Sequence, residues 1–164
     1  MIATKDGAPP ASRRIRSSRT GFTLLELLLV VGLLGTLAAI SIPTYFRALE
    51  RARVTRAIGD IKNISLTISV RMVQTGTYPD SLADAGFADL LDPWGHSYQY
   101  LKLFGTKNRG GARKDKNLVP LNDDFDLYSM GKDGASAGPL TAKASRDDVV
   151  RANSGGFIGL AADY

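Results

Sequence analysis

Residues 22–42 read FTLLELLLVVGLLGTLAAISI, and this run decides how the rest of the chain is interpreted. It carries a single charged side chain, Glu26. At about 1.5 Å per residue, a helix of this length spans about 30 Å, which is the thickness of the hydrocarbon core of a bilayer. The run therefore predicts a membrane-spanning helix close to the N-terminus.

The segment before the run is polar and basic. Residues 1–21 contain five basic side chains and one acidic side chain: Lys5, Arg13, Arg14, Arg16 and Arg19 against Asp6. A basic flank favours the cytoplasmic side of a membrane, so the rest of the chain is expected to be exported. Because most of the net charge of +5 belongs to this leader, and not to a folded face, nucleic acid is not an expected partner.

The junction between Gly21 and Phe22 separates the leader from the apolar run. An ordinary secretory signal is cut after its apolar region, so that the apolar region is lost. No convincing small-x-small cleavage site follows the run in this sequence. Cleavage between Gly21 and Phe22 would instead remove the leader alone, keep the membrane helix and create a new amine at Phe22.

The helical pattern continues after Pro43 as an amphipathic segment. Apolar residues recur there at steps of three and four and so share one helix face: Val54, Ala57, Ile58, Ile61, Ile64, Ile68 and Met72. Gly76 suits the position after the last turn. The sequence predicts one helix from about residue 22 to about residue 74, apolar all round at first and amphipathic later.

Residues 77–164 read as a small antiparallel β head. Strand patterns lie at 97–104, 124–129 and 157–160, and turns are expected at 92–95 and 131–134. Residues 135–156 are expected to form a loop. A few antiparallel strands packed on one long helix make an α+β fold.

Few residues in the head are suited to catalysis. The chain has no cysteine and one histidine, His96, which falls in a predicted turn without an assignable nucleophile or acid partner. An enzyme is therefore not expected. A basic loop is expected to be solvated, with a contact to a protein partner or to DNA as the alternative; its residues are Lys107, Arg109, Arg113, Lys114 and Lys116.

The segment Gly21-Phe22-Thr23-Leu24-Leu25-Glu26, followed by the apolar run, resembles the cleavage signal of type IV prepilins. Glu26 is the fifth residue counted from Phe22, where that family keeps a glutamate. Pro43 stands where many members have a helix-bending proline. The resemblance implies that a prepilin peptidase cuts between Gly21 and Phe22 and methylates the new amine of Phe22.

Motifs in the head resemble more narrowly the major pseudopilins of type II secretion systems. These motifs are YP at 78–79, DPWGHSYQY at 92–100, DLYSMGKDG at 126–134 and DDV at 147–149. The resemblance implies a homo-oligomeric periplasmic filament that works with minor pseudopilins, an inner-membrane platform and a secretin to export folded proteins. The alternative is a subunit of a surface type IV pilus that serves adhesion, motility or DNA uptake.

With this resemblance the chain divides into four expected segments. They are a cleaved leader over 1–21, a transmembrane and filament-core helix over 22–43, an amphipathic helix over 44–76 and a periplasmic head over 77–164. Before assembly the chain would cross the inner membrane once, with the head in the periplasm.

Three residues of the helix are candidates for a role in assembly. Glu26 would neutralise the Phe22 amine of a neighbouring subunit, a pair that offsets its desolvation only in the filament; the alternative is a glutamate that reaches the headgroups. Gly35 and Pro43 would bound a stretch of weak helix, because Pro43 removes a backbone donor. Unwinding there would let packed subunits lengthen, whereas the alternative is ordinary packing of small residues in a membrane.

The resemblance to the major pseudopilins also implies a calcium site in the head. Its ligands would be the side chains of Asp133 and Asp147 and the backbone carbonyl of Met130, with Asp126 or Asp148 as substitutes. Calcium prefers such oxygen ligands. The alternative is that Asp133 is a turn residue and that Asp147 and Asp148 are a solvated pair.

Overall fold

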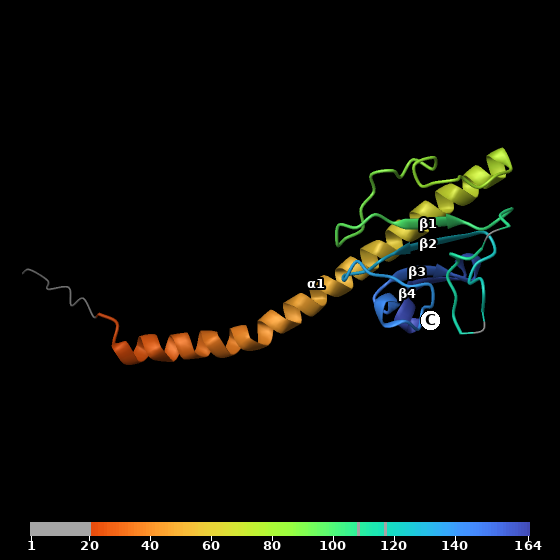
Figure 1. The fold of residues 1–164 in the computed structure, drawn as a ribbon. Helices are drawn as coiled ribbons and strands as arrows, with labels where there is room; N and C mark the ends of the chain where they lie inside the picture. The colour runs from red at the N-terminus through yellow and green to blue at the C-terminus, as the bar shows by residue number, and fades with distance from the viewer. Residues whose placement is uncertain (1–20, 108, 117) are drawn as a thin grey trace, which may run out of the picture. The chain divides into compact units, whose positions relative to one another are not determined.

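The computed structural model describes residues 21–107, 109–116 and 118–164. The leader expected over 1–21 therefore lies outside the described residues, apart from Gly21. The elements in chain order are α1 (Leu24–Thr75), β1 (Gln99–Lys102), β2 (Phe125–Ser129), β3 (Val149–Ala152) and β4 (Phe157–Leu160), with short 3₁₀ turns at Lys143–Ser145, Asn153–Gly155 and Ala161–Asp163 (Figure 1). The fold is α+β, as predicted.

Helix α1 begins and ends within two residues of the predicted bounds. At its C-terminal end the backbone N–H of Gly76 donates to the carbonyl of Met72 at 2.9 Å, and Gly76 has a φ of +74°. That left-handed conformation suits glycine, so the predicted C-terminal cap is confirmed. The helix passes through Pro43 without interruption.

The chain divides into two compact units, one ending at Ile42 and the other running from Pro43 to Tyr164. Within the first unit, the described residues 21–42 are all exposed, including the large apolar side chains of the run. By length and composition α1 can cross a membrane. An apolar surface of this extent requires lipid or other protein around it.

The second unit contains a four-stranded antiparallel sheet in the order β1-β2-β3-β4. Strands β1, β2 and β4 confirm the predicted strands, β1 and β2 with shorter bounds. Residues 135–156 were expected to form a loop, and this expectation was wrong for Val149–Ala152, which form strand β3. All four β3 residues are buried, because both faces of this strand are covered, so the sequence lacks the alternation that marks a half-buried strand.

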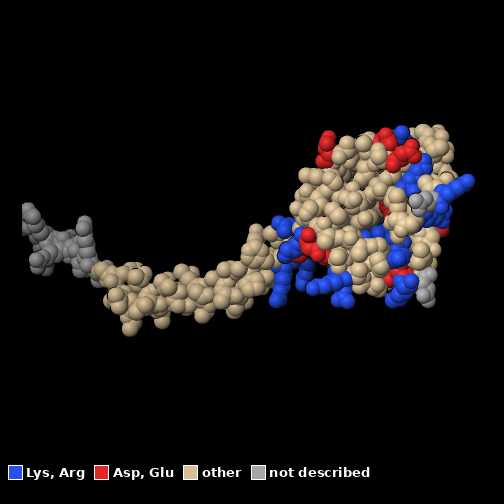
Figure 2. All heavy atoms as spheres, viewed as in Figure 1, with Lys and Arg blue, Asp and Glu red and all other residues tan. Residues whose placement is uncertain are grey.

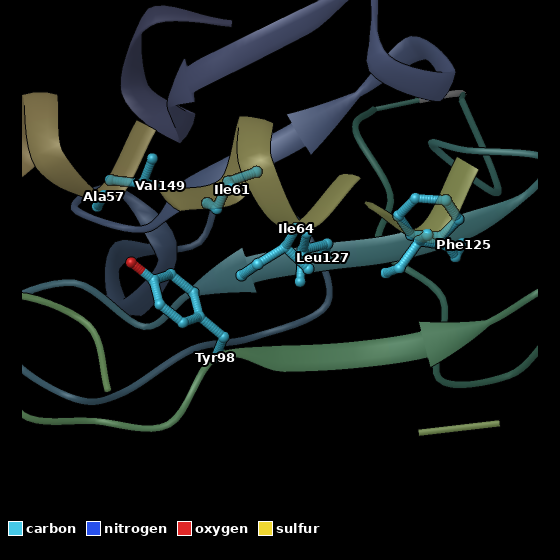
Figure 3. Packing of buried hydrophobic residues seen from close by; sticks show 8 residues of the cluster. Ala57, Ile61, Ile64, Tyr98, Phe125, Leu127 and Val149 are labelled. Carbon is cyan, nitrogen blue, oxygen red and sulfur yellow. The ribbon is translucent and has the colours of Figure 1, made fainter. Parts of the chain in front are cut away.

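The sheet packs against the amphipathic half of α1. Figure 3 shows helix residues such as Ala57, Ile61 and Ile64 meeting side chains of the sheet and its flank. The buried members of this core are Ala57, Ile61, Ile64, Ile68, Tyr98, Phe125, Leu127 and Val149. The predicted apolar face of the helix is thereby confirmed. A second, smaller cluster contains Leu121, Leu140, Val150, Ala152 and Ala161.

Two aromatic side chains fix the segment at 92–100 to the helix. The indole N–H of Trp94 donates to Glu50 at 2.9 Å, and the hydroxyl of Tyr98 donates to Asp60 at 2.9 Å. Desolvation and the bond to Asp60 raise the pKa of Tyr98, so its phenol remains a hydrogen-bond donor. These two aromatic residues therefore serve the contact between the head and the helix.

Candidate functional site

The predicted cleavage point lies in an accessible segment. Gly21, Phe22 and Thr23 precede the first turn of α1 and belong to no helix or strand. The Phe22 side chain is 79% exposed. Both residues of the predicted cleavage point are therefore exposed in the single subunit, and the helix begins two residues after Phe22.

Glu26 forms a reciprocal cap at the start of α1. The backbone N–H and the hydroxyl of Thr23 both donate to Oε2 of Glu26 at 3.0 Å. In return, the backbone N–H of Glu26 donates to Oγ1 of Thr23 at 3.2 Å. This arrangement satisfies two of the backbone donors that a helix N-terminus leaves without a partner.

The role of Thr23 was missed in the sequence, although a signal for it was present. A threonine followed three residues later by glutamate, directly before an apolar run, is the pattern of a capping box. Glu26 thus has a role within its own subunit that is separate from the expected pairing with a neighbour. Since the residue is exposed, its carboxylate is also accessible to a second copy.

Gly35 and Pro43 lie in regular helix in the single subunit. A Cβ added to Gly35 would meet nothing within 4 Å, and both residues are exposed. Unwinding between them was expected as a response to packing in a filament. It stays a prediction for the assembled state.

The two head motifs at 92–100 and 126–134 lie together. Ser129 at the end of β2 donates through its hydroxyl to Oδ2 of Asp92 at 2.5 Å. The other oxygen of Asp92 accepts the backbone N–H groups of Trp94 and His96. His96 Nδ1 lies 3.1 Å from the carbonyl of Gly131, so it donates when that nitrogen carries the proton.

Asp147 closes the loop that follows β2. Its Oδ2 accepts the backbone N–H groups of Lys132 at 2.9 Å and Asp133 at 3.1 Å. Gly131 has a φ of +65°, and a Cβ there would lie 2.3 Å from the carbonyl oxygen of Asp147. Only glycine therefore fits at residue 131. The structure brings the predicted ligand residues Asp133 and Asp147 into one loop cluster beside Met130.

Arg113 corrects the expectation of a fully solvated basic loop. Its side chain is buried, and it donates to Oδ2 of Asp148 at 2.7 Å and to the carbonyl of Ala137 at 2.9 Å. A further bond goes to Ser136, and the guanidinium lies 4.2 Å from the ring centre of Tyr128. The sequence pattern gave no sign of this role, because a basic residue among other basic residues is expected to be exposed to solvent.

Asp126 and Asp148 are buried carboxylates. Desolvation raises the pKa of both, against the lowering effect of their hydrogen bonds and of Arg113. Both oxygens of Asp126 are occupied by protein donors, namely the backbone N–H of Arg113 and the amide of Asn122. Asp126 is therefore a poor candidate for a metal ligand.

The fit of the loop cluster to calcium rests on oxygen donors. Among the residues that the structure describes, no group of three or more His, Cys, Asp or Glu side chains is arranged to hold a metal. A cation would depend on backbone carbonyls together with Asp133 and Asp147. Nearby, Oδ1 of Asp148 is buried and accepts no hydrogen bond from the described residues. These donors match the chemistry that calcium prefers.

Comparison with known proteins gives three findings. A family model described as the prokaryotic N-terminal methylation motif matches residues 16–42. "Type II secretion system core protein G" of Pseudomonas aeruginosa is 33% identical to this chain, and the match covers 75% of this chain and 90% of the relative. The protein of the same name from Vibrio cholerae is 27% identical, and the match covers 75% of this chain and 87% of the relative. A "Fimbrial protein" of Pseudomonas aeruginosa is 36% identical over 81% of this chain and 83% of the relative.

No solved structure gives a significant match. The sequence relatives and the methylation motif agree with the fold, which has one long N-terminal apolar helix and a small antiparallel sheet. The match to the methylation motif covers Gly21, Phe22 and Glu26, whose roles in cleavage and assembly stay predictions. The chain belongs to the type IV pilin-like family, in the group of type II secretion system core protein G, and is a structural subunit rather than an enzyme.

Proposed function

We propose that the chain is the main building block of a periplasmic pseudopilus that drives type II secretion. A prepilin peptidase would remove the leader, and the mature chain would remain in the inner membrane with its head in the periplasm. The observation that carries this proposal is the exposed apolar part of α1, together with the relation to core protein G over 75% of the chain.

The apolar part of α1 suits two environments in turn. Because it is apolar all round, it can be buried in lipid before assembly and among the helices of other copies afterwards. Moving the helix from lipid into the filament exchanges one apolar environment for another, so the move costs little hydrophobic free energy. The pairing of Glu26 with a neighbouring Phe22 amine would then favour the filament and set the axial register.

Assembly would require minor pseudopilins and an inner-membrane platform. A surface type IV pilus is the second candidate, and the similarity to fimbrial proteins favours it. The two are separated by deleting the gene. Loss of protein secretion with surface pili unchanged is expected, whereas loss of surface pili with normal secretion would contradict the proposal.

The first prediction concerns processing at Gly21. Intact-mass measurement of the membrane-extracted protein should give the mass of residues 22–164 with one added methyl group. The basis is an exposed peptide bond directly before an apolar helix. Substitution of Gly21 by a bulky residue should leave the leader attached. A mature chain that starts at Met1, or one without the apolar run, would contradict this processing.

Calcium binding by the head is a further part of the proposed function. The ligands would be the side chains of Asp133 and Asp147 and the backbone carbonyl of Met130, with Asp148 able to contribute. Asp147 already joins the strand β3 side of the cluster to the 131–134 turn through two hydrogen bonds. A cation held by these two carboxylates and by backbone carbonyls would strengthen that link.

Thermal unfolding of residues 45–164 tests the calcium site. At calcium concentrations about tenfold above Kd, binding to the folded state adds about 1.4 kcal/mol, which raises Tm by roughly 4–8 °C. A chelator should reverse the shift. The variant that combines Asp133→Ala with Asp147→Ala should lose it, while Asp163→Ala is a control at an exposed aspartate outside the cluster. A shift that survives in the double variant would remove this site.

A further inference from the structure

Two aromatic and two basic residues form a collar where the head unit begins. The collar consists of Tyr45, Phe46, Arg47 and Arg51. Tyr45 is 65% exposed and Phe46 is 62% exposed, and their rings lie edge to face with centres 5.9 Å apart. Arg47 and Arg51 are both exposed and, being four residues apart on α1, share one helix face.

The acidic residue nearest to the collar in the sequence, Glu50, contacts other partners. Glu50 accepts the indole N–H of Trp94 and pairs with Arg53 at 3.6 Å. Within the described part of the chain, neither Arg47 nor Arg51 has a carboxylate within ion-pair distance. Figure 2 shows Lys and Arg side chains gathered at one end of the head, beside a smaller group of Asp or Glu atoms. The two arginines of the collar are therefore exposed and outside any ion pair with the described residues.

The two arginines line a groove together with the apolar side chains of Val54 and Leu160. Its lining residues are Arg47, Glu50, Arg51, Val54, Thr55 and Leu160. Positive groups beside apolar side chains match a phospholipid, in which a phosphate adjoins a glycerol backbone and acyl chains. Tyrosine, which has an apolar body and a polar tip, is enriched at the same depth of a membrane, and Tyr45 is of this kind.

The position of the collar in the sequence places it at the level of the headgroups. Arg47 follows the last residue of the apolar run, Ile42, by five positions, which is about 8 Å of helix. Processing would also remove the five basic residues of the leader. The collar would then contain the basic residues nearest to the span, on the side away from the cytoplasm.

We propose that the collar binds anionic phospholipid headgroups on the periplasmic surface of the membrane and holds the processed subunit there before it joins a filament. This inference rests on the membrane-anchored stage of the proposed function. An acidic segment of a second copy, such as the exposed Asp80, Asp84 and Asp89, is the competing occupant. The exposed aromatic pair and the closeness to the apolar run favour lipid.

Native mass spectrometry of the processed full-length protein tests the proposal. The protein is released from micelles that contain equal amounts of phosphatidylglycerol and phosphatidylcholine, and the ratio of the two retained lipids is measured. The wild type should retain phosphatidylglycerol preferentially. Each basic residue near an anionic surface contributes a factor of about five, so Arg47→Ala with Arg51→Ala should lower the ratio by roughly 25-fold.

The matched control removes the same charge elsewhere. Lys62→Ala with Lys143→Ala changes two exposed basic residues outside the collar and should leave the ratio within about twofold, since a headgroup contact is local. Equal losses in both double variants, or no lipid preference in the wild type, would overturn the proposal. Filament yield in cells is scored separately. A collar variant that keeps the lipid preference but forms no filaments would assign the surface to a second copy.

Discussion

Replacement of Glu26 by glutamine is expected to abolish filament formation while the helix cap is kept. Glutamine can replace glutamate in a capping box, so the bonds with Thr23 should persist. The charge, however, is lost, and the Phe22 amine of the neighbouring subunit would be buried without a partner. Leaving one member of a buried ion pair alone costs about 3–5 kcal/mol, so filaments counted by electron microscopy should fall to background.

Three further variants separate the two roles of Glu26. Thr23→Val removes the hydroxyl of the cap and keeps the charge, so filaments should form at a reduced yield. Glu26→Leu should insert in the membrane but fail to assemble, and Glu26→Asp should be intermediate because its side chain is shorter. Normal filaments from Glu26→Gln together with none from Thr23→Val would show that capping, and not charge pairing, explains this residue.

Replacement of Arg113 by methionine is expected to destabilise the head by about 3–5 kcal/mol, because it leaves the buried carboxylate of Asp148 without its cation. Such a loss lowers Tm on the order of 10–20 °C. Arg109→Met changes an exposed residue of the same loop and should shift Tm little. The double variant Arg113→Met with Asp148→Asn should recover part of the loss, because no unpaired charge remains. If Arg113→Met matched Arg109→Met, the pair would be unimportant for stability.

The pH dependence of the Arg113→Met variant has a definite sign. Desolvation already raises the pKa of Asp148, and Arg113 opposes that rise. Without Arg113 the pKa of the folded state rises further above that of the unfolded state. The folded protein then binds a proton that the unfolded protein has released, so stability increases as the pH falls through the raised pKa. Unfolding curves at several pH values should show this partial rescue.

The sequence by itself determined the long apolar helix and the general fold, and it also gave the cleavage point, which stays a prediction. Residues 22–42 are predominantly apolar, and Glu26 is their only charged residue. An apolar run of this length can be recognised from the sequence without knowledge of the tertiary structure. The face that carries Ile61, Ile64 and Ile68 was likewise predictable, because a helix buried on one side repeats its apolar residues at a fixed period. Local sequence patterns also predicted the helix end at Gly76 and the turn at 92–95.

Only the tertiary structure decided which polar residues are buried and where β3 lies. A strand covered on both faces loses its alternation, so Val149–Ala152 could not be told from a loop. Arg113 and Asp148 are 35 residues apart, and nothing local shows that they form a buried pair. Their burial depends on the packing of two loops across the sheet, and a long-range contact of that kind leaves no periodic mark in the sequence.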